Sequence, residues 1–197
     1  MAAVPSTMLP LGTTVPEFSL INAVDGGLVS AADFKNDRAL LVMFICNHCP
    51  YVGHVLKEIG RIAARYQPKG LGVVAISSND VAAFPDDSPE KMRELATVES
   101  WRFPYVYDET QAVAKAFKAA CTPEFYLFDK GRKLAYRGQL DDSRPKNTEP
   151  VTGKDLRAAL DALLVGKPVS ADQKPSVGCN IKWKPGNEPS WFGGAGH

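Results

Sequence analysis

The segment that most constrains this chain is Cys46-Asn-His-Cys49, which follows a buried strand and precedes a helix. The residues up to it, 39–46, form a compact apolar run that predicts a strand buried on both faces. The residues after it carry apolar side chains three and four positions apart as far as Tyr66, which predicts an amphipathic helix. A second apolar run, 71–77, follows. Strand, helix and strand of these lengths predict a right-handed βαβ unit with parallel strands and the cysteine pair at its strand-to-helix junction.

The remainder of the chain alternates between helical and strand patterns. The predicted elements are a helix over 89–100 capped by Ser88, a strand over 103–107, a helix ending at 119 and capped by 108–111 with Gln111 reaching back, a hairpin of strands 124–128 and 133–137, and a helix over 154–165. This order predicts an α/β protein with a mixed central sheet, helices on both of its faces and a C-terminal tail.

A chain of 197 residues with 45% apolar side chains is long enough for one well-buried core. We therefore expect one domain over residues 1–166 and a C-terminal extension over 167–197. The extension is rich in Pro, Gly and Lys, and we expect its Trp183, Trp191 and Phe192 to pack onto the domain. Residues 193–197, Gly-Gly-Ala-Gly-His, are expected to be disordered.

Charge and hydropathy exclude several classes of partner. Lys and Arg number 23 and Asp and Glu 22, with no block of like charge, so a nucleic-acid partner is not expected. The N-terminus has no basic leader, and no apolar run approaches the roughly 18 residues that a membrane span requires. These features predict a cytoplasmic protein without a membrane partner. Because cytoplasmic thiols are normally reduced, a Cys-x-x-Cys pair there indicates catalysis or metal binding rather than a structural disulfide.

A second motif gives the cysteine pair its context. Thr122-Pro123 opens a strand roughly 75 residues after Cys46, and a hairpin and terminal helix follow it. With the leader over 12–20 and the helix and strand inserted before Thr122, this pattern resembles the thioredoxin fold in its AhpC/TSA, redoxin and TlpA-type branch. The resemblance covers roughly residues 11–165 and leaves the tail outside.

The resemblance implies roles for four residues. Cys46 would be the nucleophilic thiol and Cys49 the resolving thiol, while Pro123 would be a cis-proline facing them and Thr122 would present its backbone to a partner polypeptide. Helix electrostatics also favour Cys46 as the attacking thiol if it lies just before the helix, where free N–H groups and the helix dipole stabilise a thiolate. Cys49 is then expected one turn inside the helix.

Five other residues bear on the site, four of them with two interpretations each and His54 with one. His48, within a Cys-x-His-Cys centre similar to that of strongly oxidising disulfide catalysts, is either a tuning group for the thiolate or an exposed loop residue. Cys121 is either an auxiliary thiol or a small buried side chain. Cys179 is either a redox thiol on a tail that docks through Ile181 and Trp183, or incidental. His54 is expected on the solvated helix face, and Arg144 in a charged loop that either touches substrate or is solvated.

The primary functional hypothesis is a thiol–disulfide oxidoreductase with no metal or other cofactor, whose partner is a protein or small-molecule thiol or disulfide. One alternative is a redoxin-like copper or zinc chaperone using Cys46, Cys49 and a further donor among Cys121, Cys179 and His48. Another is a thiol-dependent peroxidase with antioxidant activity. Peroxiredoxins use Pro-x-x-x-Thr-x-x-Cys, and here Val42 replaces the proline and Cys46 the threonine, which disfavours peroxide chemistry. The oligomeric state is not predicted.

Overall fold

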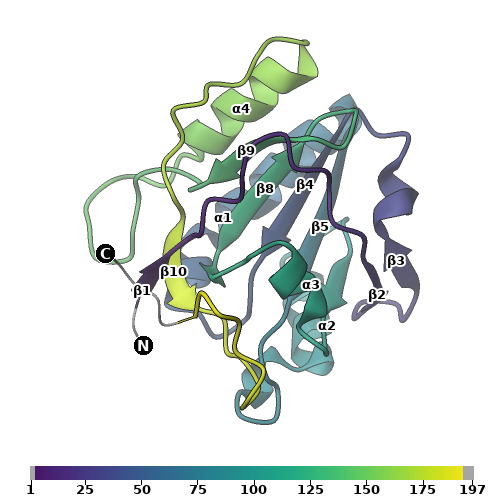
Figure 1. Ribbon diagram of the computed structural model, residues 1–197, viewed down its shortest axis with the longest axis vertical. Helices are drawn as coiled ribbons and strands as arrows, with labels where there is room; N and C mark the ends of the chain where they lie inside the picture. Colours follow the sequence, from purple (N-terminus) through teal and green to yellow (C-terminus); the bar gives the residue numbers. More distant parts are fainter. Residues whose placement is uncertain (1–2, 193–197) are drawn as a thin grey trace.

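The computed structural model describes residues 3–192 and builds them around a seven-stranded mixed sheet (Figure 1). Its strands are β2 (Ser19–Asn22), β3 (Leu28–Ser30), β4 (Ala39–Phe44), β5 (Leu71–Ser77), β6 (Tyr105–Tyr107), β8 (Glu124–Phe128) and β9 (Leu134–Gly138). The order across the sheet is β3-β2-β6-β5-β4-β8-β9. β5 pairs in parallel with both β4 and β6, which confirms the predicted βαβ unit, and the other neighbours are antiparallel.

Helices cover both faces of this sheet, and the alternation along β4 explains how. They are α1 (Pro50–Tyr66), α2 (Pro89–Val98), α3 (Ala112–Ala116) and α4 (Lys154–Leu164). Leu41 and Met43 of β4 pack into one apolar cluster with α1, α2 and α4, whereas Val42 and Phe44 pack into a second cluster with α3. Because successive side chains of a strand point to opposite faces, a fully apolar β4 fills both clusters. The thioredoxin-like α/β architecture expected from the sequence is confirmed.

Several predicted boundaries and one predicted cap are wrong. α2 ends at Val98 rather than at residue 100, and β6 begins at Tyr105 rather than at residue 103. β4 ends at Phe44 rather than at residue 46, and the helix expected to reach residue 119 ends at Ala116, because Lys118 takes a left-handed backbone conformation (φ 50°). The side chain of Gln111 does not complete a capping box but donates to the carbonyls of Ser78 and Lys182. The buried carboxylate of Asp108 instead accepts the first N–H groups of α3, from Val113 and Ala114.

The C-terminal extension joins the domain through a second, three-stranded sheet. Its strands are β1 (Ala3–Pro5), β7 (Cys121–Thr122) and β10 (Val177–Asn180), all antiparallel in the order β1-β10-β7. Figure 1 shows β10, in yellow, lying alongside β1. Ile181 and Trp183 are buried in the cluster that contains α3, which confirms that this part of the tail docks. Residues 193–197, for which disorder was expected, lie outside the described residues.

Within residues 3–192, no helix combines the length and apolar character needed to span a bilayer.

Candidate functional site

The two cysteines of Cys46-x-x-Cys49 lie in the short connection between β4 and α1, and their side chains are each only 1% exposed. Cys49 is the N-cap of α1, in an extended conformation, and Pro50 takes the first helical position. Proline suits this position because its missing N–H needs no partner there. The expectation that Cys49 lies one turn inside the helix is therefore wrong. The helix end lies closer to Cys49 than to Cys46.

The Thr122–Pro123 segment contacts both thiols. Its peptide bond is cis, as expected for Pro123. The hydroxyl Oγ1 of Thr122 lies 3.4 Å from Sγ of Cys46, and the carbonyl oxygen of Thr122 lies 3.3 Å from Sγ of Cys49. Thr122 is itself 3% exposed. The structure thus brings together Cys46, Cys49, Thr122 and Pro123, which the sequence places in two segments far apart.

A buried carboxylate that the sequence did not identify, Asp87, organises the loop between the two cysteines. It is fully buried and accepts hydrogen bonds from the backbone N–H groups of Asn47 (2.7 Å) and His48 (3.2 Å) and from the side chain of Asn79 (2.7 Å). Its second oxygen lies 2.5 Å from Nδ1 of His48. Asp87 comes from the 3₁₀ turn Pro85–Asp87, in a polar loop with no motif of its own, so sequence reasoning had no signal for it.

His48 occupies a defined position rather than a solvated one. Its side chain is 15% exposed, and its ring stacks on Phe84 with 5.2 Å between ring centroids. Because Nδ1 is paired with Asp87, the imidazole supports the carboxylate that shapes the loop beside Cys46.

The surroundings of Cys46 and Cys49 shift the pKa values of the two thiols in opposite directions. The pKa of Cys49 is lowered to about 5, chiefly by a hydrogen bond from the thiol of Cys46, with further contributions from Cys179, Thr122 and the Val52 N–H that outweigh the effect of burial. The pKa of Cys46 is raised well above its usual value by its hydrogen bond to Cys49, by burial and by the charge of Asp87. A thiolate is stabilised by donors and by a helix N-terminus. In the reduced protein, the negative charge is therefore favoured on Cys49.

A third thiol, Cys179, reaches the same site from strand β10. It is 3% exposed, it packs in one buried cluster with Cys46 and Cys49, and it pairs in register with Thr122, whose carbonyl oxygen lies 3.3 Å from Sγ of Cys49. Burial, the interaction with Cys49 and the charge of Cys49 raise its pKa to about 12. The Cys179 thiol therefore keeps its proton beside Cys49.

Cys121 is buried but its sulfur does not join these thiols. Its Sγ lies 3.9 Å from both the carbonyl oxygen of Pro123 and the carboxylate of Glu124. Burial and the nearby Glu124 raise its pKa well above the usual value. The small-buried-side-chain interpretation fits this geometry.

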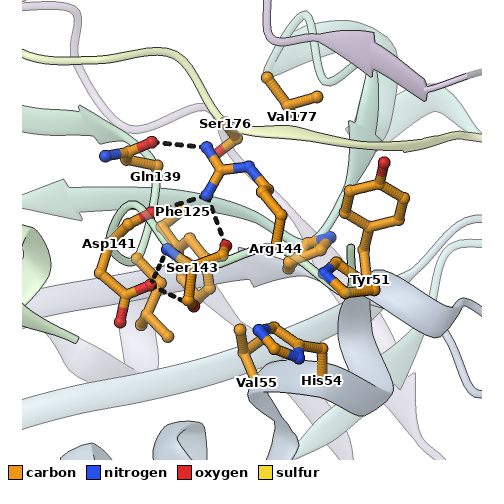
Figure 2. Close-up of a pocket in the computed structure, with 13 residues that line it drawn as sticks. Tyr51, His54, Val55, Phe125, Gln139, Asp141, Ser143, Arg144, Ser176 and Val177 are labelled. Atoms are coloured by element: carbon orange, nitrogen blue, oxygen red, sulfur yellow. Dashed lines mark hydrogen bonds between the residues drawn. The ribbon is translucent and has the colours of Figure 1, made fainter. Parts of the chain in front are cut away.

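His54 and Arg144 line a small pocket beside Pro123 (Figure 2). The expectation that His54 is a solvated surface residue is wrong, since it is half-buried where α1 meets this pocket. Arg144 donates to the side chain of Gln139 (2.5 Å) and to the carbonyls of Asp141 and Ser143 (2.7 Å each). The Arg144 guanidinium therefore stabilises its own loop through hydrogen bonds and is not fully solvated.

The donor atoms also allow a test of the metal alternative. One ligand atom each from Cys46, His48 and Asp87 lies within 4.8 Å of the others, and within residues 3–192 the three thiols of Cys46, Cys49 and Cys179 do not form such a group. Both oxygens of Asp87 already accept hydrogen bonds, and Nδ1 of His48 is paired with one of them. A closed tetrahedral site for zinc needs four ligands converging at about 2.0–2.3 Å from the ion. The residues of this site do not fit that requirement.

Comparisons with known proteins agree with the fold. The structure of an uncharacterized conserved protein from Geobacillus kaustophilus is 59% identical in sequence, with a TM-score of 0.92 over 94% of this chain and 98% of that one. A hypothetical protein from Sinorhizobium meliloti 1021 is 48% identical, with a TM-score of 0.90 over 92% and 99%. The thioredoxin domain of a thiol-disulfide oxidoreductase from Bacteroides vulgatus, at 19% identity, matches with a TM-score of 0.57 over 66% and 89%, and shows the shared fold.

No curated protein sequence matches this chain. The Redoxin family model matches residues 10–156, a span that contains both Cys46-x-x-Cys49 and Thr122-Pro123. This chain is a member of the Redoxin family.

Proposed function

We propose that this protein is a thiol–disulfide oxidoreductase whose redox centre is the Cys46–Cys49 pair. The observation that carries the proposal is the position of the two thiols against one segment. At the start of α1, Sγ of Cys46 lies 3.4 Å from Oγ1 of Thr122 and Sγ of Cys49 lies 3.3 Å from the carbonyl oxygen of Thr122, beside the cis Thr122–Pro123 bond. Their surroundings favour the negative charge on Cys49. A dithiol centre needs a thiolate at the pH of the cell, and the pKa of about 5 for Cys49 supplies one that can accept the proton of Cys46.

In the proposed reaction, Cys49 acts first as a general base. The Cys49 thiolate accepts the proton of Cys46 as Sγ of Cys46 attacks one sulfur of a partner disulfide, so that a mixed disulfide forms and the first partner thiolate leaves. Sγ of Cys49 then attacks Sγ of Cys46 and closes the Cys46–Cys49 disulfide, and the second partner sulfur leaves with the proton that Cys49 releases. Two electrons pass from the pair to the partner. Because a stabilised thiolate favours the reduced form, the same contacts make the disulfide a better oxidant.

The remaining roles follow from contacts. Thr122 is proposed to align the partner through its backbone and to hold Cys46 through Oγ1, at 3.4 Å. His48 is proposed to tune the pair indirectly, by positioning the Asp87 carboxylate. The proposed partner is a protein or small-molecule thiol or disulfide, and the proposed location is the cytoplasm, as the near-neutral sequence with few cysteines suggests.

Peroxide reduction is a second candidate, favoured by one specific observation. The thiolate is favoured on Cys49, the position that aligns with the catalytic cysteine of peroxiredoxins, and the Cys46 and Cys179 thiols contact it. Cys49 would displace an alcohol or water from the peroxide, giving a sulfenic acid, and a neighbouring thiol would then form a disulfide and release water. Val42 and Cys46 in place of the peroxiredoxin proline and threonine argue for a slow reaction.

One comparison of substrates separates these candidates. Reduced wild-type protein, Cys46→Ser, Cys49→Ser and the buried control Cys121→Ser would each be given a peptide disulfide with dithiothreitol as reductant and, separately, hydrogen peroxide. We expect rapid peptide reduction by wild type and Cys121→Ser, loss of it in the other two variants, and slow peroxide consumption throughout. Rapid peroxide consumption that survives in Cys46→Ser, with no peptide turnover by wild type, would contradict the proposal and favour the peroxidase.

A further inference from the structure

Strand β10 of the C-terminal tail occupies the backbone edge next to the cis-proline. Cys179 pairs with Thr122 and Asn180 with Cys121 in an antiparallel ladder. An antiparallel strand added to an exposed edge is a common way for a protein to bind an extended polypeptide. Here the chain's own tail fills the edge of Thr122, which the proposed function assigns to a partner.

The fit between this strand and the site depends on a glycine. A Cβ atom added to Gly178 would lie 2.0 Å from the carbonyl oxygen of Thr122, so only glycine permits this approach. Further contacts hold the strand from its C-terminal side, because the N–H of Lys182 donates to the side chain of Asn79 (2.9 Å) and Asn79 in turn donates to Asp87 (2.7 Å). The tail is thus tied to the same carboxylate that organises the cysteine loop.

Three thiols pack together at this point of the molecule. Cys46, Cys49 and Cys179 lie in one buried cluster, Sγ of Cys49 lies 3.3 Å from the carbonyl oxygen of Thr122, and Thr122 pairs with Cys179. Within residues 3–192 these three sulfurs do not form a group that converges as metal ligands would. The Lys182 ammonium, three residues after Cys179, donates to the carbonyl oxygen and the side chain of Asn180 (2.8 and 2.7 Å).

We propose that Cys179 is a third redox-active thiol, held by β10 in the place of a partner's cysteine, and that it exchanges with the Cys46–Cys49 disulfide. The inference rests on the proposed function. In this step, the sulfur of Cys179 attacks Sγ of Cys49, the Cys49–Cys179 bond forms, and the Cys46–Cys49 bond breaks. Cys46 leaves as a thiolate and takes up the proton that Cys179 releases. The step consumes no external oxidant, because it moves one disulfide from one pair to the other.

The exchange has a consequence for catalysis. It returns Cys46 to the thiol state while the oxidising equivalent is stored at Cys49–Cys179. Since Cys46 and Cys49 are each 1% exposed under β10 and its surroundings, a polypeptide partner must displace β10 from Thr122 to reach them. The tail is therefore both a store for the disulfide and a competitor for the partner's position.

Disulfide mapping tests the proposal on the full-length chain. Cleavage after Lys and Arg leaves Cys46 and Cys49 in one peptide (39–57) and Cys121 and Cys179 in two others, so a Cys49–Cys179 bond joins two peptides that a Cys46–Cys49 bond does not. Cys46→Ser would be oxidised with oxidised glutathione, quenched with acid and mapped by mass spectrometry. The expected product is a Cys49–Cys179 disulfide. Cys46→Ser/Cys121→Ser should give the same product, and Cys46→Ser/Cys179→Ser should give a Cys49–glutathione adduct instead.

Wild type and Cys179→Ala distinguish failure of the third-thiol proposal from failure of the proposed function. Circular dichroism verifies that each protein is folded. If both form Cys46–Cys49 but folded Cys46→Ser yields only the glutathione adduct, the third-thiol proposal is overturned while the proposed function stands. If neither wild type nor Cys179→Ala forms Cys46–Cys49 at any glutathione ratio, the proposed function fails, and the exchange from that disulfide fails with it.

Discussion

Cys49 and Cys121 are equally buried and contact the same Thr122–Pro123 segment, yet their surroundings have opposite effects on a thiol. Cys49 is the N-cap of α1 and receives hydrogen bonds from the thiols of Cys46 and Cys179, and its pKa is lowered to about 5. Cys121 faces acceptors only, the Pro123 carbonyl and the Glu124 carboxylate, and its pKa is raised. Burial alone would raise both values. The donors around the sulfur therefore favour a thiolate at Cys49, and the acceptors around Cys121 disfavour one.

The largest expected effect comes from removing the sulfur that has the donors. Cys49→Ser should lower the rate of peptide-disulfide reduction by on the order of a thousandfold or more, because neither the shared proton nor the internal disulfide remains. Cys121→Ser should stay within about twofold of wild type, measured by the same dithiothreitol-driven assay. Equal losses of disulfide-reduction rate in Cys49→Ser and Cys121→Ser would contradict the different roles assigned to these two cysteines.

The carboxylate beside Cys46 should matter next. Asp87→Ala leaves the Asn47 and His48 N–H groups and the Asn79 amide without their buried acceptor, and should lower the free energy of unfolding by about 3–5 kcal/mol. The matched control is Asp86→Ala, at the exposed neighbouring position, which should cost less than about 0.5 kcal/mol. Urea denaturation of the reduced proteins measures both. A small cost for Asp87→Ala would mean that the carboxylate does not organise the cysteine loop.

A smaller cost is expected where the tail approaches the site. Gly178→Ala places a methyl group against the Thr122 carbonyl, and should lower the free energy of unfolding by about 1–3 kcal/mol. It should also increase the rate at which a thiol reagent modifies Cys49, because β10 is pushed away. The control is Gly53→Ala on the exposed side of α1, where an added Cβ meets nothing within 4 Å. It should not lower the free energy of unfolding and should not increase the rate at which Cys49 is labelled. Unchanged labelling of Cys49 in Gly178→Ala would show that β10 does not cover it.

The smallest expected effect comes from a change of pH, which requires no substitution in the chain. In reduced wild type, the ultraviolet absorbance of thiolate should rise with a midpoint near pH 5, where Cys49 titrates. Because its folded pKa lies below the value of 9.0 for a free thiol, its ionisation should add to the free energy of unfolding as pH increases from about 5 to 9, and this contribution is lost as pH falls through 5. Cys49→Ser should lose the step and Cys121→Ser should retain it. A midpoint near 9 in wild type would contradict the assignment.

The sequence predicted the fold around this site better than the detailed geometry within it. Apolar periodicity located β4, α1 and β5, and the family resemblance carried by Thr122-Pro123 implied that a cis-proline faces the cysteines. The position of Cys49 was misjudged by one turn because the start of a helix depends on backbone conformation that a sequence pattern leaves open by several residues.

One feature of the site, Asp87, had no local signal, and another, the position of Cys179, had only a weak one. Asp87 resembles any other acidic residue of a polar loop until the fold buries it against the Asn47 and His48 N–H groups. The position of Cys179 depends on pairing between β10 and β7, which are more than fifty residues apart. Such non-local pairing is set by the whole tertiary structure, although Gly178 beside an otherwise well-defined tail cluster was a weak indication of close packing.

The measurement that tests the central claim most directly is the reduction potential of the Cys46–Cys49 couple. Metal-free protein would be equilibrated with glutathione or dithiothreitol buffers, and the state of each cysteine read by alkylation and mass spectrometry. The stabilised thiolate on Cys49 predicts a two-electron couple with a potential less negative than the roughly −270 mV of thioredoxin and moving toward roughly −120 mV. Absence of a Cys46–Cys49 disulfide at every potential, together with stoichiometric binding of zinc or copper, would contradict it.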